Sequence, residues 1–382
     1  MNSFKIPKIR FNRFDSVWEE DRIADIVKIS AGGDVDKVKL KESGKYPVIA
    51  NALTNKGIVG FYDDYKVKAP AVTVTGRGDV GYAVARHENF TPIVRLLTLQ
   101  SENIDVDYLE NQINSMRILN ESTGVPQLTA PQLGNYKVYH PEIEEQSAIG
   151  SLFRTLDELL SSYKDNLTNY QSIKTTMLSK MFPKSEQTIP EIRLDGFKEE
   201  WEVKKLRKVV QINPKSELPE KFKYIDLESV VGTRINKIRE EYKETAPIRA
   251  QRLAEKGDIF YQTVRPYQKN NYLFKLDDVD YVFSTGYAQL RPKRTSCDSD
   301  FLLTLLQDNK FLSKVLDRCT GTSYPAINAK DLVEISIVIP KVEEQQAIGS
   351  YFSNLDNLIN SYQEKISQLE TLKKKLLQDM FI

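Results

Sequence analysis

The chain has 382 residues, 54 of them Lys or Arg and 53 Asp or Glu, so its net charge is only +1 at pH 7. This length allows two or three domains with cores of their own, and the balanced charge neither favours nor excludes nucleic acid as a partner. The two cysteines, Cys297 and Cys319, are too few for a disulfide framework or a thiolate metal site. The sequence has no apolar run near the roughly 18 residues of a membrane span. We therefore expect a cytoplasmic protein without membrane contact.

The first half opens with a mixed segment of about residues 16–140. Short runs with β-like alternation, separated by Gly, Asn and Asp, predict strands in it. These runs are Tyr46–Ala50, Gly57–Tyr62, Ala71–Thr75 and Tyr82–Arg86. A helical segment from about Val106 to Leu119, a turn-like motif at Ser122–Leu128 and a β-like run at Tyr136–Tyr139 follow.

A long helix is predicted after Pro141. Apolar residues recur at steps of four and three from Ile149 to Met181, which is typical of a coiled-coil seam. At 1.5 Å per residue, a helix of about 38 residues would be roughly 57 Å long. Because helices on globular surfaces are usually shorter, the apolar stripe of this one indicates a long helical partner.

The second half repeats this order with different residues. Its insert, about residues 200–340, has predicted strands at Lys223–Leu227, Asp258–Val264 and Tyr281–Ser284. A helical segment from about Asp300 to Arg318, a turn-like motif at Gly321–Ile327 and a β-like run at Ile335–Ile339 come next. After Pro340, a second long helix has the same register of apolar residues, from Ile348 to Met380.

The two halves share their ends and differ in the middle. The block Glu144–Phe153 recurs almost unchanged 199 residues later as Glu343–Phe352. Upstream, five residues recur at an offset of 183: Pro7, Ile9, Arg10, Phe14 and Trp18 match Pro190, Ile192, Arg193, Phe197 and Trp201. One frame that carries two different inserts indicates a protein that reads two different things.

We therefore predict an α+β fold with an internal pseudo-two-fold repeat. Two mixed α/β domains, residues 1–141 and 184–340, would be separated by two long helices, residues 142–183 and 341–382, that pair as an antiparallel coiled coil. In the alternative, each helix docks on its own domain.

The segment Gly76–Gly81 has the letters of the dinucleotide-binding GxGxxG motif. The motif requires a helix directly after it, whereas Tyr82–Ala85 alternates like a strand. We therefore predict a hairpin turn with Arg77 at its tip, where a guanidinium could reach guanine or phosphate.

The sequence contains no convincing catalytic centre. Asp226, Glu241 and Lys243 can be written as the D…ExK arrangement of metal-dependent nucleases, but Glu240–Glu244 also matches an ordinary solvated face. The chain has only two histidines, His87 and His140, which leaves little for acid–base catalysis and gives no His-rich metal cluster.

Two features of the second insert suggest nucleic-acid binding. The loop Thr263–Asn271 combines Arg and Lys, which suit guanine or phosphate, with Gln and Asn, which suit adenine. The surrounding segment, Arg234–Lys269, has nine basic and five acidic residues. A polar loop without a ligand and a mixed solvated face explain the same residues.

Taken over its full length, the chain resembles the specificity subunits of type I restriction-modification enzymes. The resemblance is carried by the Pro-x-x-Glu-Glu-Gln start of each long helix, at Pro141–Gln146 and Pro340–Gln345, by Trp18 and Trp201, and by Gly257–Pro266. The two turn motifs do not match residue by residue, because Gly321 aligns with Ser122 and Ser323 aligns with Gly124.

The resemblance implies a non-catalytic subunit that reads a bipartite, asymmetric site on double-stranded DNA. Each insert would be a target recognition domain, and the helices would be a spacer that docks two methyltransferase subunits, with translocating restriction subunits completing the assembly. The sites for S-adenosylmethionine, ATP and Mg²⁺ would lie in those partners, with no metal site in this chain. The runner-up interpretation is a coiled-coil adaptor that binds proteins rather than DNA.

Two groups of site residues follow from this interpretation. The predicted DNA contacts are Arg77, Arg86, Arg234, Arg265, Lys269 and Asn270. The predicted partner-docking residues are Glu144, Glu145, Gln146, Phe153, Glu343, Glu344, Gln345 and Phe352, because a subunit that binds two identical partners needs two similar surfaces.

Overall fold

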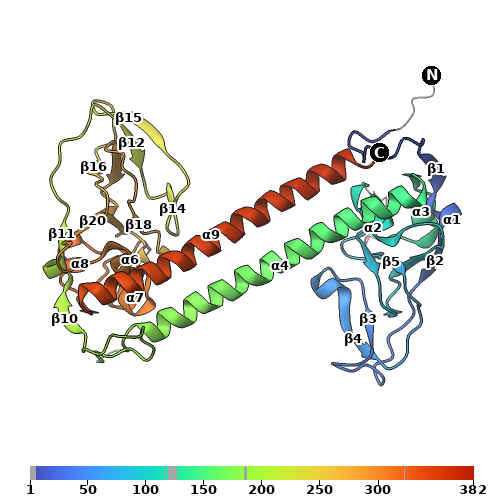
Figure 1. The fold of residues 1–382 in the computed structure, drawn as a ribbon, viewed down its shortest axis with the longest axis horizontal. Helices are drawn as coiled ribbons and strands as arrows, with labels where there is room; N and C mark the ends of the chain where they lie inside the picture. The colour runs from blue at the N-terminus through green and yellow to red at the C-terminus, as the bar shows by residue number, and fades with distance from the viewer. Residues whose placement is uncertain (1–5, 117, 119–126, 185–186, 322) are drawn as a thin grey trace. The chain divides into compact units, whose positions relative to one another are not determined.

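The computed structural model describes residues 6–116, 118, 127–184, 187–321 and 323–382 (Figure 1). The chain forms two compact units: unit 1 is Met1–Asp165 with Gln363–Ile382, and unit 2 is Asn166–Tyr362. Each unit therefore combines one insert with a part of each long helix. Among the described residues, no helix is both long and apolar enough to cross a membrane.

Unit 1 contains a four-stranded sheet, a three-stranded sheet and a two-stranded ribbon. The four-stranded sheet has the order β2-β8-β5-β6, the three-stranded sheet β4-β3-β7, and the ribbon β1-β9. The bounds are β1 Glu19–Arg22, β2 Lys28–Ala31, β3 Tyr46–Ile49, β4 Ile58–Tyr62, β5 Ala71–Val74, β6 Ala83–Arg86, β7 Thr91–Pro92, β8 Leu97–Gln100 and β9 Lys137–His140. The predicted strands of the first insert are thus confirmed.

The hairpin predicted for Gly76–Gly81 is also confirmed. Strands β5 and β6 pair antiparallel, with Val74 opposite Ala83, so the glycine-rich segment is the loop between them. This connection leaves no place for a phosphate-binding helix, and Arg77 is exposed on the loop.

Three short α-helices and a 3₁₀ helix complete the described part of the first insert: α1 (Ile23–Ile26), α2 (Val106–Ser115), α3 (Ala130–Gly134) and η1 (Thr54–Gly57). The side chain of Asp105 caps α2 by accepting a hydrogen bond from the Tyr108 amide. Helix α2 ends earlier than the predicted Leu119, and most of the predicted turn Ser122–Leu128 lies outside the described residues.

Unit 2 repeats the four-stranded sheet of unit 1 and differs in its second sheet. The repeated sheet has the order β11-β20-β17-β18, the second sheet β15-β12-β19-β16, and two ribbons pair β10 with β21 and β13 with β14. The first bounds are β10 Glu202–Lys205, β11 Val210–Ile212, β12 Lys221–Ile225, β13 Val230–Val231, β14 Arg234–Ile235 and β15 Arg239–Tyr242. The others are β16 Ala250–Leu253, β17 Ile259–Gln262, β18 Tyr272–Leu273, β19 Tyr281–Ser284, β20 Tyr287–Pro292 and β21 Ser336–Ile339.

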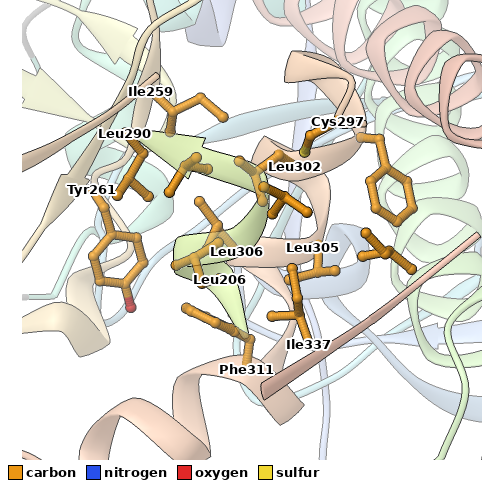
Figure 2. Packing of buried hydrophobic residues seen from close by; sticks show 14 of the residues in the cluster. Leu206, Ile259, Tyr261, Leu290, Cys297, Leu302, Leu305, Leu306, Phe311 and Ile337 are labelled. Atoms are coloured by element: carbon orange, nitrogen blue, oxygen red, sulfur yellow. The ribbon is translucent and has the colours of Figure 1, made fainter. Parts of the chain in front are cut away.

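The helix predicted for Asp300–Arg318 is two helices. Helix α6 (Ser299–Gln307) and helix α7 (Asn309–Leu316) are separated by Asp308, whose backbone is extended. The break turns α7 so that Phe311 joins the core of the unit together with Leu302 and Leu306 of α6 (Figure 2). Short helices α5 (Leu206–Val209) and α8 (Ala329–Val333) lie at the two ends of the insert.

The two long helices are α4 (Ile143–Met181) and α9 (Val342–Asp379), close to the predicted length. They pair antiparallel within each unit. In unit 1, Asp157 bonds Lys373 and Lys164 bonds Glu370. In unit 2, Tyr170 stacks on Tyr362 and Lys174 bonds Asp356. As residue numbers rise along α4, those of the partners on α9 fall, which confirms the predicted antiparallel pairing.

Candidate nucleic-acid interface and helix joints

The repeated helix starts form a buried ion pair in each unit. In unit 1, Arg10 Nε and Nη2 donate to the two oxygens of Glu145 at 2.7 and 2.6 Å. In unit 2, Arg193 makes the same forked contact with Glu344, with both distances 2.7 Å. Both carboxylates are buried. The hydrogen bond from each arginine to its glutamate raises the pKa of Arg10 and of Arg193.

The glutamine after each of these glutamates ties the long helix to the insert. Gln146 Oε1 accepts from the Asp105 amide at 3.0 Å, and its Nε2 donates to the Pro141 carbonyl at 2.8 Å. Gln345 makes the corresponding bonds with the Asp298 amide at 3.0 Å and the Pro340 carbonyl at 2.9 Å. Asp105 and Asp298 are the caps of α2 and α6, so each glutamine fixes the start of a neighbouring helix.

A glycine and an aromatic cluster complete each of these contacts, which we call the helix joints. A Cβ on Gly150 would lie 2.5 Å from Asp105 Oδ1, and one on Gly349 would lie 2.7 Å from Asp298 Oδ1. The cluster of unit 1 contains Trp18, Tyr108, Phe153, Met380 and Phe381, and that of unit 2 contains Trp201, Phe301, Phe352, Met181 and Phe182. Each joint therefore uses the start of one long helix and the end of the other.

The helix joints show that the prediction of partner docking was wrong for most of its residues. Six of the eight proposed docking residues are buried inside their own unit: Glu145, Gln146, Phe153, Glu344, Gln345 and Phe352. They hold the insert to the helix and have no surface left for a partner. Glu144 and Glu343 are exposed, so for these two residues partner docking stays a prediction.

Two predicted DNA contacts lie at corresponding places in the two units. Arg77 follows the end of β5 by three residues, and Arg265 follows the end of β17 by three residues. Each loop also forms a β-bridge with the segment before a later short helix: Arg77 with Gln127 before α3 in unit 1, and Val264 with Ala326 before α8 in unit 2. The repeated frame thus presents an arginine-bearing loop after the same strand of each four-stranded sheet.

The loop after β17 has an unusual backbone and a stacked arginine. Arg265 and Lys269 both have a φ of 54°, in the left-handed region. Residues other than glycine rarely adopt this backbone conformation, and it often marks a functional site. The Arg265 guanidinium lies 4.3 Å from the ring centroid of Tyr324, close enough for a cation–π contact. Tyr324 itself is 62% exposed, so this stack is at the surface.

A pocket of about 370 Å³ adjoins this loop, and we call it the β17 pocket. Its lining includes two predicted contacts, Arg265 and Asn270, and four polar residues that were not predicted as contacts: Glu228, Gln262, Gln268 and Tyr324. Gln268 belongs to the loop Thr263–Asn271 and Gln262 is the last residue of β17, whereas Tyr324 comes from the turn Gly321–Ile327. Only the fold brings that turn to the loop. In unit 1 a pocket of about 560 Å³ adjoins the loop after β5.

Two other predicted DNA contacts make hydrogen bonds to the protein itself. Arg86 is buried, donates to Thr73 Oγ1 at 2.9 Å and to the Lys56 carbonyl at 2.8 Å, and its burial lowers the pKa of the guanidinium to about 10. Lys269 Nζ donates to the Gln307 carbonyl at 2.7 Å and to Asn309 Oδ1 at 2.6 Å. We therefore correct the assignment of Arg86, whose buried side chain stabilises unit 1, whereas the DNA contact of the half-buried Lys269 stays a prediction. Arg234 lies on β14, in the β13-β14 ribbon, and its predicted role stays a prediction.

The nuclease-like residues of unit 2 are occupied by ion pairs. Asp226 bonds Arg239 at 2.9 Å, and Lys243 bonds Glu220 at 3.3 Å. Because the basic residues of the segment Arg234–Lys269 include such paired ones, its net charge overstates the cations available to a phosphate. These pairs give Asp226 and Lys243 structural partners in place of a metal and a water.

One group in unit 1 has the composition of a cation site. Glu19 and His140 lie opposite each other in the β1-β9 ribbon, and Asp21 Oδ2 is 3.0 Å from His140 Nε2. The potential ligand atoms of these three residues all lie within 4.8 Å of one another. At the corresponding place in unit 2, Ile339 is opposite Glu202, so this group is not needed for the fold.

Comparison with known proteins agrees with the repeat. The family model described as the type I restriction modification DNA specificity domain matches twice, over residues 15–169 and 198–371. The MjaVIII specificity subunit of Methanocaldococcus jannaschii is 24% identical and the match covers 94% of this chain and 91% of that one. The HindI specificity subunit of Haemophilus influenzae is 28% identical over 46% of this chain and 36% of that one. The crystal structure of the S subunit of a type I restriction-modification system from M. genitalium has the same fold, with a TM-score of 0.72, 17% identity and 99% of each chain covered.

Proposed function

Because the chain belongs to the family of type I restriction-modification DNA specificity proteins, we propose that each of its two units reads one half of a split, asymmetric DNA target. The observation that supports this most is the arginine-bearing loop that follows the same strand of the four-stranded sheet in both units. The frame is shared, whereas the loops and the second sheets differ. Two readers of one design would thus contact different bases.

The proposed DNA-contacting surfaces are these two loops. Arg77 and Arg265 provide guanidinium groups for guanine or phosphate, and Asn270 adds an amide beside Arg265. An Arg265→Ala substitution should weaken binding by about 1–3 kcal/mol. If Arg265 reads a base, the loss is confined to one position of one half-site, whereas a phosphate contact would affect all sequences alike.

We place the docking of two methyltransferase subunits on the long helices. Ile173 of unit 2 and Leu372 of unit 1 are corresponding positions of the repeat, and their side chains are 40% and 44% exposed. Two exposed apolar residues at equivalent positions of the repeat suit two identical partners. Replacing either one by Asp should remove one methyltransferase subunit from the complex and leave the other bound. Thr175→Asp is the matched control, since Thr175 is exposed and lies about 200° around the helix from Ile173.

The chain itself is proposed to be non-catalytic and to act in the cytoplasm. Restriction subunits would join the same assembly, and the sites for S-adenosylmethionine, ATP and Mg²⁺ would lie in the partner subunits. The ion pairs of Asp226 and Lys243 support this, because they occupy the groups that a nuclease centre would use. Magnesium-dependent nicking by the purified chain, abolished by Asp226→Ala, would contradict it.

Salt dependence separates DNA reading from the adaptor alternative, which family membership does not favour. The complex of the chain with its methyltransferase partner would be titrated against a labelled duplex at rising salt. Binding that neutralises several phosphates should weaken steeply, with a slope of about −0.9 per phosphate in log–log form. Weak DNA binding, together with salt-insensitive capture of other proteins, would favour the adaptor.

A further inference from the structure

We propose that the β17 pocket reads a guanine in the half-site of unit 2. This inference rests on the proposed function and deepens it by naming the base and the residues that select it. The pocket is lined by Gln262, Arg265, Gln268 and Asn270, all from one loop and the end of one strand. The base that the pocket selects depends on which hydrogen-bonding atoms of these side chains are already used.

Gln262 is buried, and two backbone groups fix the orientation of its amide. Its Nε2 donates to the Val264 backbone carbonyl at 2.8 Å, and its Oε1 accepts from the backbone N–H of Asn270 at 3.3 Å. An amide nitrogen carries two hydrogens and accepts none. The second hydrogen of Gln262 Nε2 must therefore go to an acceptor, and the acceptor is Gln268 Oε1 at 2.7 Å.

This bond decides what Gln268 offers to a ligand. Its oxygen faces the buried Gln262, so the exposed Gln268 side chain has its NH₂ donors left for a ligand. Asn270 is in the same situation, because its Oδ1 accepts from the Gly232 amide at 2.9 Å. Arg265 has donors only and is held against Tyr324. All three side chains thus have donors to offer.

Guanine is the base that suits such a set. In the major groove it presents two acceptors, N7 and O6, whereas adenine presents one acceptor and one donor, and cytosine presents a donor. The pocket lining also includes the exposed Glu228, whose carboxylate is an acceptor of the kind that the N4 amino group of the paired cytosine takes. Donors plus one carboxylate match the pattern of a G·C pair.

Gln262 would act as a positioning residue in this scheme. A glutamate at this place has no donor, so Gln268 would turn its NH₂ towards the new carboxylate and its oxygen outward. A glutamine with both a donor and an acceptor available suits adenine N7 and N6. The substitution Gln262→Glu should therefore admit adenine where the wild type requires guanine.

The test is the set of methylated sites in cells that co-express the chain with its methyltransferase subunit, mapped by single-molecule sequencing. We expect the wild-type motif to have a fixed G·C pair in one half. Gln268→Ala should reduce discrimination at that position by about 5- to 150-fold and leave the other half unchanged. Gln251→Ala, an exposed glutamine on β16 of the same unit, is the matched control.

Two further variants test the hydrogen-bonding roles of Gln268 and Gln262 separately. Gln268→Glu changes an exposed residue from donor to acceptor, so it should fold and reject guanine at that position. Gln262→Glu places a charge in the interior, so its folding is first checked by the fluorescence of Trp201 in a Trp18→Phe background. Equal loss of methylation at all sequences in Gln268→Ala would indicate a phosphate contact and overturn the inference. A split motif that none of these variants changes would also overturn it while leaving the proposed function intact, and absence of any split motif would contradict the proposed function itself.

Discussion

Replacing Gly349 by alanine tests the helix joint of unit 2, because the sign of the change in the free energy of unfolding depends on the packing there. A Cβ at this position would lie 2.7 Å from both Asp298 Oδ1 and the Phe301 nitrogen, and 3.0 Å from Asp300 Cβ. Two of these atoms form the cap of α6, where the Asp298 carboxylate accepts from the Phe301 amide at 2.9 Å. The added methyl group must therefore push α9 and the start of α6 apart.

The expected effect combines three contributions. Loss of the cap costs about 1 kcal/mol, overpacking costs about 1–3 kcal/mol, and the better helix propensity of alanine returns about 1 kcal/mol. The free energy of unfolding should therefore fall by about 1–3 kcal/mol. Propensity alone would raise it by about 1 kcal/mol, so the two explanations differ in sign.

The assay uses tryptophan fluorescence, since the two tryptophans of the chain, Trp18 and Trp201, each lie in one joint. Urea unfolding of a Trp18→Phe background, followed by fluorescence, reports the joint of unit 2. Ser350→Ala is the control, because Ser350 is exposed on the next residue of the same helix and should gain a few tenths of a kcal/mol. An alanine at 349 that raised the unfolding midpoint as the control does would refute the close packing at this joint.

Three further outcomes are expected. Glu344→Gln should lower the free energy of unfolding by about 2–4 kcal/mol, measured by urea denaturation, because it leaves the largely buried Arg193 without a charged partner; no change would mean that the pair adds nothing to stability. Burial, with Asp157 as a second cause, raises the pKa of Glu110 to about 7. The folded state therefore binds more protons than the unfolded state from about pH 4.5 to 7, and stability falls as pH rises through that window. Glu110→Gln should remove this pH dependence and stabilise the chain at pH 8 by about 1–3 kcal/mol, measured by thermal unfolding across pH, whereas an unchanged pH profile would contradict the shift. Ile173→Asp and Leu372→Asp should each lower the number of bound methyltransferase subunits from two to one in light-scattering measurements, and the double substitution to none; retention of both subunits would exclude this docking surface.

The frame of the protein could be predicted from the sequence because it depends on local periodicity and on the repeat. Apolar steps near 3.5 identify α4 and α9, and alternation identifies strands such as β5 and β17. The break between α6 and α7 was missed, since Asp308 continues an otherwise helical pattern. Its extended backbone is set by packing of α7 on the core.

The roles of charged side chains were harder to predict. Glu145 and Glu344 stand at helix starts, where acidic residues are usually exposed, and their arginine partners lie 135 and 151 residues away in the sequence. The pairing could have been predicted from the repeat, because Arg10 and Arg193 recur in the same two copies as these glutamates. Arg86 gave no such signal: its inward direction follows from the pairing of β5 and β6.

If the two units are independent readers on one frame, exchanging one of them should change only the half-site that it reads. Residues 200–340 would be replaced by the corresponding segment of a relative, and methylated positions would be mapped in cells that co-express the methyltransferase subunit. We expect a split motif in which one half changes and the other half is retained. A change in both halves, or methylation without a split motif, would show that the two units do not read half-sites independently.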